Sequence, residues 1–197
     1  VTGGVSYHDA LTGPDGPFVG FDRVDVHGSG MADLEAYALL VVLRSVDGEA
    51  LRARRFAVRR FLDGGGVLVT LGEAPTSWFP GCRWEPETAD DLEPPLVADH
   101  PLLAGAAADA LFWHREGPRW CGHGHLVPPV GAEVLVGNGA GDAWLYIDRA
   151  STRGVILAAT NLDFDAHAYY GNELARVLLD RVLRWAEAQA EARAATW

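Results

Sequence analysis

Three side chains that can bind a metal ion alternate along one short segment. Cys121, His123 and His125 lie in the sequence WCGHGH, residues 120–125. If this segment is extended, side chains two residues apart emerge on the same face. Thiolate and imidazole groups are the usual ligands of zinc, so the segment predicts a site for a divalent metal such as zinc. His8 or the loop at 163–167 would complete the ligand set.

A second interpretation of the same segment stays open, because its spacing matches no standard zinc signature. The glycines would form a turn and the histidines would hydrogen-bond to the backbone. Cys121 would then be a small buried apolar side chain.

Candidate acid/base groups follow two apolar runs that read as buried strands. Glu73 comes after the run 67–71, and Asp163, Asp165 and His167 come after the run 155–160. A carboxylate with an imidazole suits general acid/base catalysis near neutral pH. The alternative for Glu73 is a carboxylate in the first turn of a helix, and the alternative for the loop is a solvated segment that caps the final helix.

Five further residues are candidates for contact with a substrate: His8, Asp9, Arg44, Trp78 and Trp120. Arg44 follows an apolar run and would bind an anionic or hydroxyl-rich ligand, although it would equally well bridge Glu73. The two tryptophans are candidates for stacking on a ligand, with core or lid positions as the alternative.

The elements that would position these groups are clearest between Asp47 and Glu73. Asp47 is an expected helix N-cap, and Leu51, Val58, Phe61 and Leu62 recur at helical spacing. Gly64 is expected to end the helix in the left-handed conformation. The apolar run 67–71 then predicts a strand covered on both faces.

The rest of the chain predicts further strands at 1–5, 21–26, 39–43, 133–136, 144–147 and 155–160, and a final helix capped by Asn172. Segment 74–130 lacks clear periodicity and predicts an irregular excursion over the ends of the strands. We therefore expect one α/β domain, residues 1–197, with a flavodoxin-like, mostly parallel sheet and helices on both faces. In such a sheet, sites lie beyond the carboxyl ends of the strands.

Composition limits the classes of partner. The net charge is −11 and all 16 basic residues are arginine, so nucleic-acid binding and lysine chemistry are not expected. The longest apolar run, residues 38–43, is too short to span a membrane, and two cysteines are too few for a disulfide framework. We expect a cytoplasmic protein with a small-molecule substrate and no nucleotide cofactor. A homodimer stays open, since an exposed apolar face would support one.

Several motifs, taken in order, resemble the ThuA-like branch of the class I glutamine-amidotransferase-like superfamily. They are TGG with YHD within residues 2–9, DLEAYALLVVL at 33–43, FLDGGGVLVTLGE at 61–73, HPLLAG at 100–105, GAEVL at 131–135, and RGVILAATNLDFDAH at 153–167 followed by LARVLLDRVLRWA at 174–186. The resemblance implies a flavodoxin-like sheet and a link to carbohydrate use, and some members look like metal-binding proteins. The nucleophilic cysteine of working amidotransferases is missing, because the turn after the strand at 67–71 reads LGEA.

The resemblance therefore implies an enzyme other than a glutamine amidotransferase. We expect hydrolysis or elimination on a small polar, carbohydrate-derived substrate, with Glu73, His167 and Asp165 as catalytic groups and possible help from a metal. The alternative is a non-catalytic ligand-binding or assembly domain that kept the fold and lost the chemistry.

Overall fold

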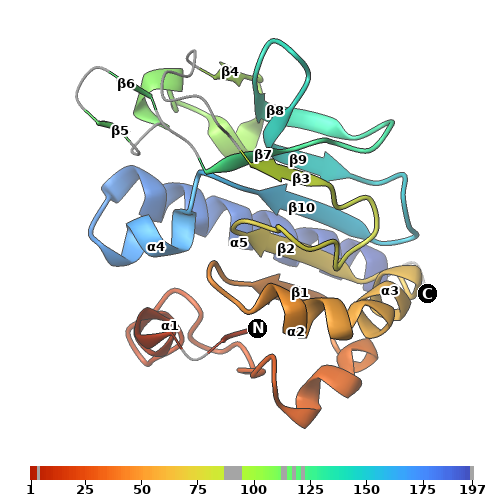
Figure 1. Ribbon diagram of the computed structural model, residues 1–197. Helices are drawn as coiled ribbons and strands as arrows, with labels where there is room; N and C mark the ends of the chain where they lie inside the picture. The colour runs from red at the N-terminus through yellow and green to blue at the C-terminus, as the bar shows by residue number, and fades with distance from the viewer. Residues whose placement is uncertain (4, 87–94, 112–114, 117–118, 121–122, 196–197) are drawn as a thin grey trace.

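The computed structural model describes residues 1–3, 5–86, 95–111, 115–116, 119–120 and 123–195. Its main feature is a sheet of eight strands in the order β1-β2-β10-β9-β7-β3, with β8 also paired to β9 and β4 paired to β8 (Figure 1). A separate two-stranded sheet is formed by β5 (Arg115–Glu116) and β6 (Arg119–Trp120).

The parallel part of the sheet consists of β1 (Leu39–Val42), β2 (Val67–Leu71) and β10 (Val155–Ala159). β2 is the central strand, with Leu39 of β1 on one side and Val155 of β10 on the other side of Val67. All five residues of β2 and all five of β10 are buried, as continuous apolar runs predict. The strand expected at 67–71 is confirmed.

The rest of the sheet is antiparallel, so the prediction of a flavodoxin-like, mostly parallel sheet is wrong. β9 (Ala143–Asp148) runs antiparallel to β10, to β8 (Glu133–Gly137) and to β7 (Gly124–Leu126). β3 (Trp84–Pro86) pairs antiparallel with β7, and β4 (Leu96–Val97) pairs antiparallel with β8. The fold is a curled mixed sheet with few helices.

The direction of β9 follows from the length of its connection. Only residues 149–154 separate β9 from β10, whereas a crossover between parallel strands needs about a dozen residues or more. β8 and β9 form a hairpin for the same reason. The apolar pattern of these strands indicates burial, but burial alone does not distinguish a parallel neighbour from an antiparallel one.

Helices cover the two faces of the parallel strands. α2 (Gly48–Ala53) and α3 (Arg55–Asp63) pack on one face, and α5 (Glu173–Ala194) packs on the other with α4 (Phe164–Tyr169) and α1 (Ser6–Leu11) beside it (Figure 1). In the part of the chain that the structure describes, four short 3-10 helices complete the elements: η1 (Ser29–Ala32), η2 (Leu34–Ala36), η3 (Pro101–Leu103) and η4 (Ala108–Ala110).

The helical segment before β2 differs from its prediction in two ways. It is two helices that meet at Arg54 rather than one, and Gly65 (φ 95°), not Gly64, takes the left-handed conformation. The Asp47 cap is confirmed, since its carboxylate accepts the N–H groups of residues 49 and 50 at 2.9 and 3.2 Å. The predicted apolar stripe of this segment is buried.

The N-terminal residues form less strand than predicted. In place of two strands at 1–5 and 21–26, the described residues contain one parallel bridge between Thr2 and Asp25. α1 begins at Ser6, directly after this short pairing. The final helix is as predicted, because the Asn172 side chain accepts the Ala175 N–H at 3.0 Å.

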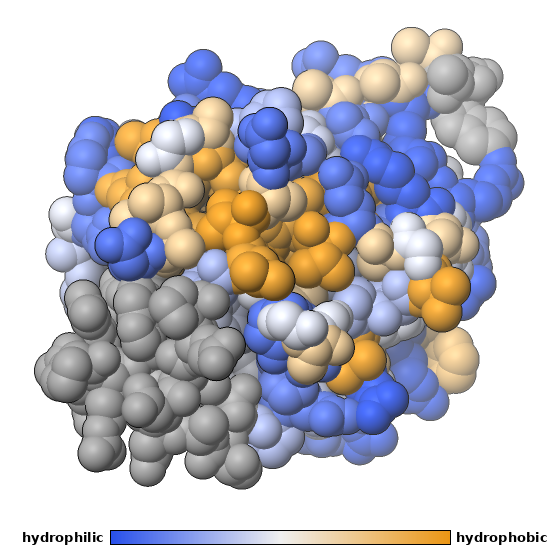
Figure 2. Space-filling view, turned by 90° about the horizontal axis from the view of Figure 1, so that it is seen from above, coloured by the Kyte–Doolittle hydropathy of each residue, from blue (hydrophilic) through white to orange (hydrophobic). Residues whose placement is uncertain are grey.

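Apolar side chains also reach the surface. Figure 2 shows them gathered on the face that carries β4 and β8, where Leu96 of β4 is 63% exposed. Within the described ranges, every helix is too short or too polar to cross a membrane.

Candidate functional site

Polar side chains meet where the three parallel strands end. The Arg44 guanidinium follows β1, with its Nε 2.9 Å from Oδ1 of Asp163 and one terminal nitrogen 3.3 Å from Oε1 of Glu73. Glu73 follows β2 and Asp163 follows β10. Oε1 of Glu73 also lies 3.9 Å from Nδ1 of His123, just before β7. We call Arg44, Glu73, His123, Asp163 and Asp165 the strand-end cluster.

The backbone of Arg44 is held as firmly as its side chain. Its N–H donates to Oδ2 of Asp165 at 2.8 Å. Its carbonyl accepts the Tyr7 hydroxyl at 2.8 Å and lies 2.7 Å from Nε2 of His8. α1 and α4 are thus both attached to the end of β1. These contacts hold the main chain from which the guanidinium extends.

His8, predicted as a substrate contact, is fully buried and serves this attachment. Its Nδ1 accepts the Gly3 N–H at 3.2 Å, so the ring proton of a neutral imidazole is on Nε2 and is donated to the Arg44 carbonyl. Burial lowers the pKa of His8, which favours this neutral form. Both ring nitrogens are therefore engaged by the backbone.

Tyr7 shares the Arg44 carbonyl and was not predicted as part of the site. Burial, with a smaller contribution from Asp165, raises its pKa to about 12, so the hydroxyl keeps its proton and acts as a donor.

The backbone at the strand ends is strained. Ser45 (φ 64°), Asn161 (φ 58°) and Asp163 (φ 36°) have positive φ, and all three closely follow β1 or β10. Such conformations cost about 1–3 kcal/mol each and collect at functional sites. Here the strain turns the chain sharply, so that the side chain of Asp163 returns toward Arg44.

Asn161 is a second residue that the sequence interpretation missed. Its Oδ1 accepts the His123 N–H at 2.9 Å, and its Nδ2 donates to the Gly124 carbonyl at 2.6 Å. This side chain therefore positions the start of β7 over the end of β10. An asparagine just after a buried strand is the available sequence signal, because asparagine tolerates the left-handed conformation better than most residues.

The members of the cluster differ in their access to solvent. The side chains of His123, Glu73 and Arg44 are 50%, 29% and 24% exposed, whereas Asp163 and Asp165 are buried. Glu73 and His123 are thus the groups that a small molecule can reach, with Arg44 beside them. Asp163 lies behind Arg44 as its buried counter-charge.

Asp165, predicted to be catalytic, has both carboxylate oxygens engaged by the backbone. Oδ2 accepts the Arg44 N–H, and Oδ1 accepts the Ala166 N–H at 2.9 Å. Burial nevertheless raises its pKa to about 7. This residue joins α4 to the end of β1 rather than facing solvent.

The predicted metal-binding segment is divided in the structure. His123 faces Glu73, while Nε2 of His125 lies 3.7 Å from carboxylate oxygens of both Glu85 and Asp142. His123 precedes β7 in a bend, so the assumed alternation of an extended chain does not apply to it. Cys121 lies outside the described residues. Among those that are described, no three His, Cys, Asp or Glu side chains form a group able to hold a metal, and the expected description as metal-binding is withdrawn.

Of the remaining predicted site residues, Asp9 and Trp78 lie apart from the strand-end cluster, and His167 is bonded to it through its main chain. Asp9 is exposed and pairs with Arg23. Trp78 is 2% exposed in the core against Phe79, which matches the core alternative. Trp120 is in β6, and its side chain is not described. His167 is in the last turn of α4, where its N–H donates to the Asp163 carbonyl at 2.9 Å.

Comparisons with known proteins show the fold and no family. No family model matches the chain, and no curated protein matches it. Among solved structures, the chain is similar to "Cytoplasmic Protein STM3548 from Salmonella typhimurium", with a TM-score of 0.50 and 13% identity over 83% of this chain and 80% of that chain. At this identity the similarity extends to the fold alone.

Proposed function

We propose that the strand-end cluster binds a small polar molecule and catalyses hydrolysis or elimination by acid/base chemistry. The observation that supports this proposal is the position of Glu73, whose Oε1 lies near both the Arg44 guanidinium and the His123 ring. Glu73 would accept a proton from water or substrate, and His123 would supply one to the leaving group. Arg44 would hold an anionic or hydroxyl-rich part of the substrate.

The acid/base partner proposed for Glu73 differs from the one that the sequence predicted. His167 and Asp165 were the expected partners, but Asp165 is buried with both oxygens bonded to backbone N–H groups. His123 is the imidazole that reaches Glu73 and is half exposed. We therefore assign Asp165 a positioning role. His167 lies one helical turn beyond Asp163 and has no role in this proposal.

The substrate class rests on the sequence resemblance. We propose a ThuA-like protein that acts on a carbohydrate-derived compound in the cytoplasm, and the similar Salmonella protein is itself named as cytoplasmic. A guanidinium beside a carboxylate and an imidazole suits the many hydroxyl and carboxylate groups of sugar acids and lactones.

A second function is favoured by a separate observation. Every hydrogen-bonding part of Arg44, namely its N–H, its carbonyl and its guanidinium, contacts another residue of the chain. Such a closed network also suits a non-catalytic domain, in which the cluster only holds the strand ends together. The two functions predict different results when Glu73 is changed.

A panel of sugar lactones, sugar esters and sugar acids tests the proposal by product formation. The Glu73→Gln and His123→Ala variants are compared with Glu133→Gln, an exposed carboxylate at the start of β8. We expect each cluster variant to lower the rate by about 10²-fold or more, the usual contribution of a general acid or base. The control should keep its rate. Equal rates in all four proteins would favour the non-catalytic domain.

A further inference from the structure

The first two residues of the chain lie in the middle of a sheet, not at its edge. On the β1 side, the Val1 amino group donates to the Val41 carbonyl, and the Leu43 N–H donates to the Val1 carbonyl at 3.3 Å. This is the ladder of a parallel strand, in which one residue bonds to two residues of its neighbour that are two apart.

The opposite side of the same segment is also paired. The Thr2 N–H donates to the Val24 carbonyl at 2.9 Å, and the Val26 N–H donates to the Thr2 carbonyl at 3.0 Å. Thr2 and Asp25 form a parallel bridge. Residues 1–2 therefore occupy the place of a strand between β1 and segment 24–26.

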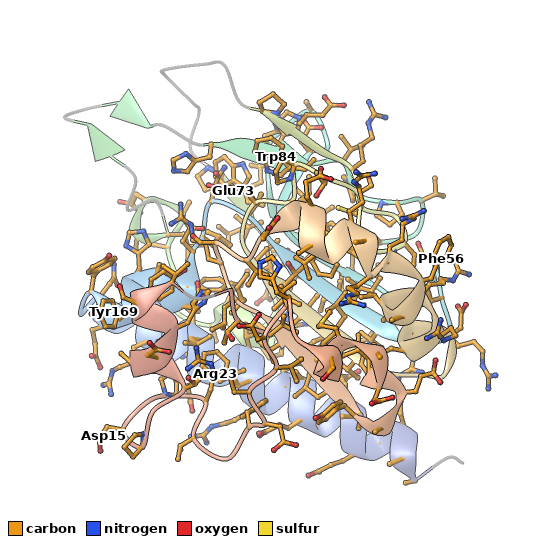
Figure 3. The ribbon with its side chains drawn as sticks, turned by 60° about the horizontal axis from the view of Figure 1, so that its bottom comes forward. Asp15, Arg23, Phe56, Glu73, Trp84 and Tyr169 are labelled. Atoms are coloured by element: carbon orange, nitrogen blue, oxygen red, sulfur yellow. The ribbon has the colours of Figure 1, made fainter. Side chains whose placement is uncertain are left out.

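A groove continues the line of this strand beyond the Val1 amino group. It has a volume of about 340 Å³, and residues 37–41 form one wall and residues 20–24 the other. These two segments end at Val41 and Val24, whose carbonyls accept hydrogen bonds from the Val1 amino group and the Thr2 N–H. Arg23, labelled in Figure 3, lies on the second wall. The groove thus runs between these two segments, along the line that a strand continuing residues 1–2 backwards would follow.

Hydrogen-bond geometry shows which groups of β1 face the groove. The Val67 N–H of β2 donates to the Ala38 carbonyl at 2.9 Å, so Leu40 and Val42 direct their N–H groups to β2. Leu39 and Val41 direct theirs the other way, toward the groove that they line.

The Val1 amino group is in an environment that suits an amide better than a cation. It is buried, and desolvation lowers its pKa to about 5. Burying an ammonium group is costly, whereas a peptide N–H at the same position would make the same hydrogen bond to Val41 without a charge.

We propose that the groove is the seat of an extended strand that runs parallel to β1 and is joined to Val1 by a peptide bond. About four residues would reach from Val1 to Tyr37, at about 3.3 Å for each residue. Apolar side chains from both core clusters, including Phe18, Phe21 and Leu40, line the groove. The strand should therefore be apolar on both faces. This inference is independent of the proposed function.

Amide hydrogen exchange in the chain 1–197 is the first test. The Leu39 and Val41 amides should exchange at least tenfold faster than the Leu40 and Val42 amides, since only the second pair is bonded to β2. Equal protection of all four amides would show that nothing is missing beside β1 and would overturn the proposal.

The second test extends the chain. One variant carries Val-Leu-Val-Val directly before Val1, and the matched control carries Gly-Ser-Asp-Ser at the same place. The apolar extension should raise the unfolding temperature by several degrees, slow the Leu39 and Val41 amides, and resist an aminopeptidase that trims the control. Equal unfolding temperatures and equal trimming would contradict the proposal. A separate Val-Leu-Val-Val peptide that protects the same amides as well as the joined strand would contradict the peptide bond to Val1.

Discussion

Nε of Arg44 lies 2.9 Å from Oδ1 of Asp163, a carboxylate that is 1% exposed. This contact joins the end of β1 to the end of β10 across β2, whose own end carries Glu73. The cation therefore neutralises a buried charge on one side and holds a more exposed carboxylate on the other. The geometry of the whole site depends on this arrangement.

Removing the guanidinium should be strongly destabilising. Arg44→Met leaves Asp163 buried without its cation, and breaking a buried pair in this way costs about 3–5 kcal/mol. Arg59→Met is the matched control, because Arg59 pairs with Asp63 at 2.7 Å on the surface, and such pairs contribute about 0–1 kcal/mol. Urea unfolding measures both. Equal losses of stability in the two variants would show that the buried pair has no special role.

Asp165 should give stability a specific pH dependence. Burial raises its pKa to about 7 in the folded protein, against about 3.9 in an unfolded chain. Between these values the unfolded chain releases the proton while the folded protein retains it. The contribution of this residue to the unfolding free energy therefore falls as pH rises from about 4 to about 7, and then stays constant.

The Asp165→Asn variant lacks this titration and provides the reference. The unfolding free energy of the natural chain minus that of the variant should decrease over the same pH interval, as measured by urea unfolding in a series of buffers. A difference that stays constant or increases with pH would mean that Asp165 is ionised throughout.

Gly72 lies against the backbone of Arg44 and should not tolerate a side chain. A Cβ at this position would be 2.9 Å from the Arg44 Cα, so Gly72→Ala must displace the end of β1. Gly139→Ala is the control, since nothing lies within 4 Å of its added Cβ. We expect a stability loss of about 1–3 kcal/mol, typical of overpacking, for Gly72→Ala alone. A loss of the same size for both glycines would contradict the close approach.

The strain at Asn161 can be separated from its hydrogen bonds. Asn161→Gly and Asn161→Ala both remove the bonds to His123 and Gly124. Both variants must adopt φ near 58°, which costs alanine about 1–2 kcal/mol and glycine little, because glycine has no Cβ. The alanine variant should be less stable than the glycine variant by that amount in denaturant unfolding. Equal stability would mean that the loop relaxes out of the left-handed conformation.

The sequence was most informative where burial alone decides the structure. The continuous apolar runs at β2 and β10 predicted both strands, and Glu73 was correctly expected to follow one of them. The predicted contact between Arg44 and Glu73 is confirmed, since a terminal guanidinium nitrogen lies 3.3 Å from Oε1 of Glu73. Local signals of this kind are carried by a few neighbouring residues, so one sequence is enough to read them.

The antiparallel direction of β7, β8 and β9 and the identity of the imidazole beside Glu73 depend on contacts between residues far apart in the chain. His123 reaches Glu73 across 50 positions of the chain, because β7 pairs with β9 next to the end of β10. Neither the spacing of histidines nor their alternation contains that information. The same spacing suggested a shared face with His125, which instead lies beside Glu85 and Asp142.

The central claim is that Glu73, Arg44 and His123 form one binding site for a small polar molecule. The most direct measurement is the unfolding temperature of the natural chain and of Glu73→Gln and Glu133→Gln, each with a panel of sugar acids and lactones. We expect at least one compound to stabilise the natural chain and Glu133→Gln but not Glu73→Gln. Stabilisation of all three proteins to the same extent would place the binding site elsewhere and contradict a site formed by Glu73, Arg44 and His123.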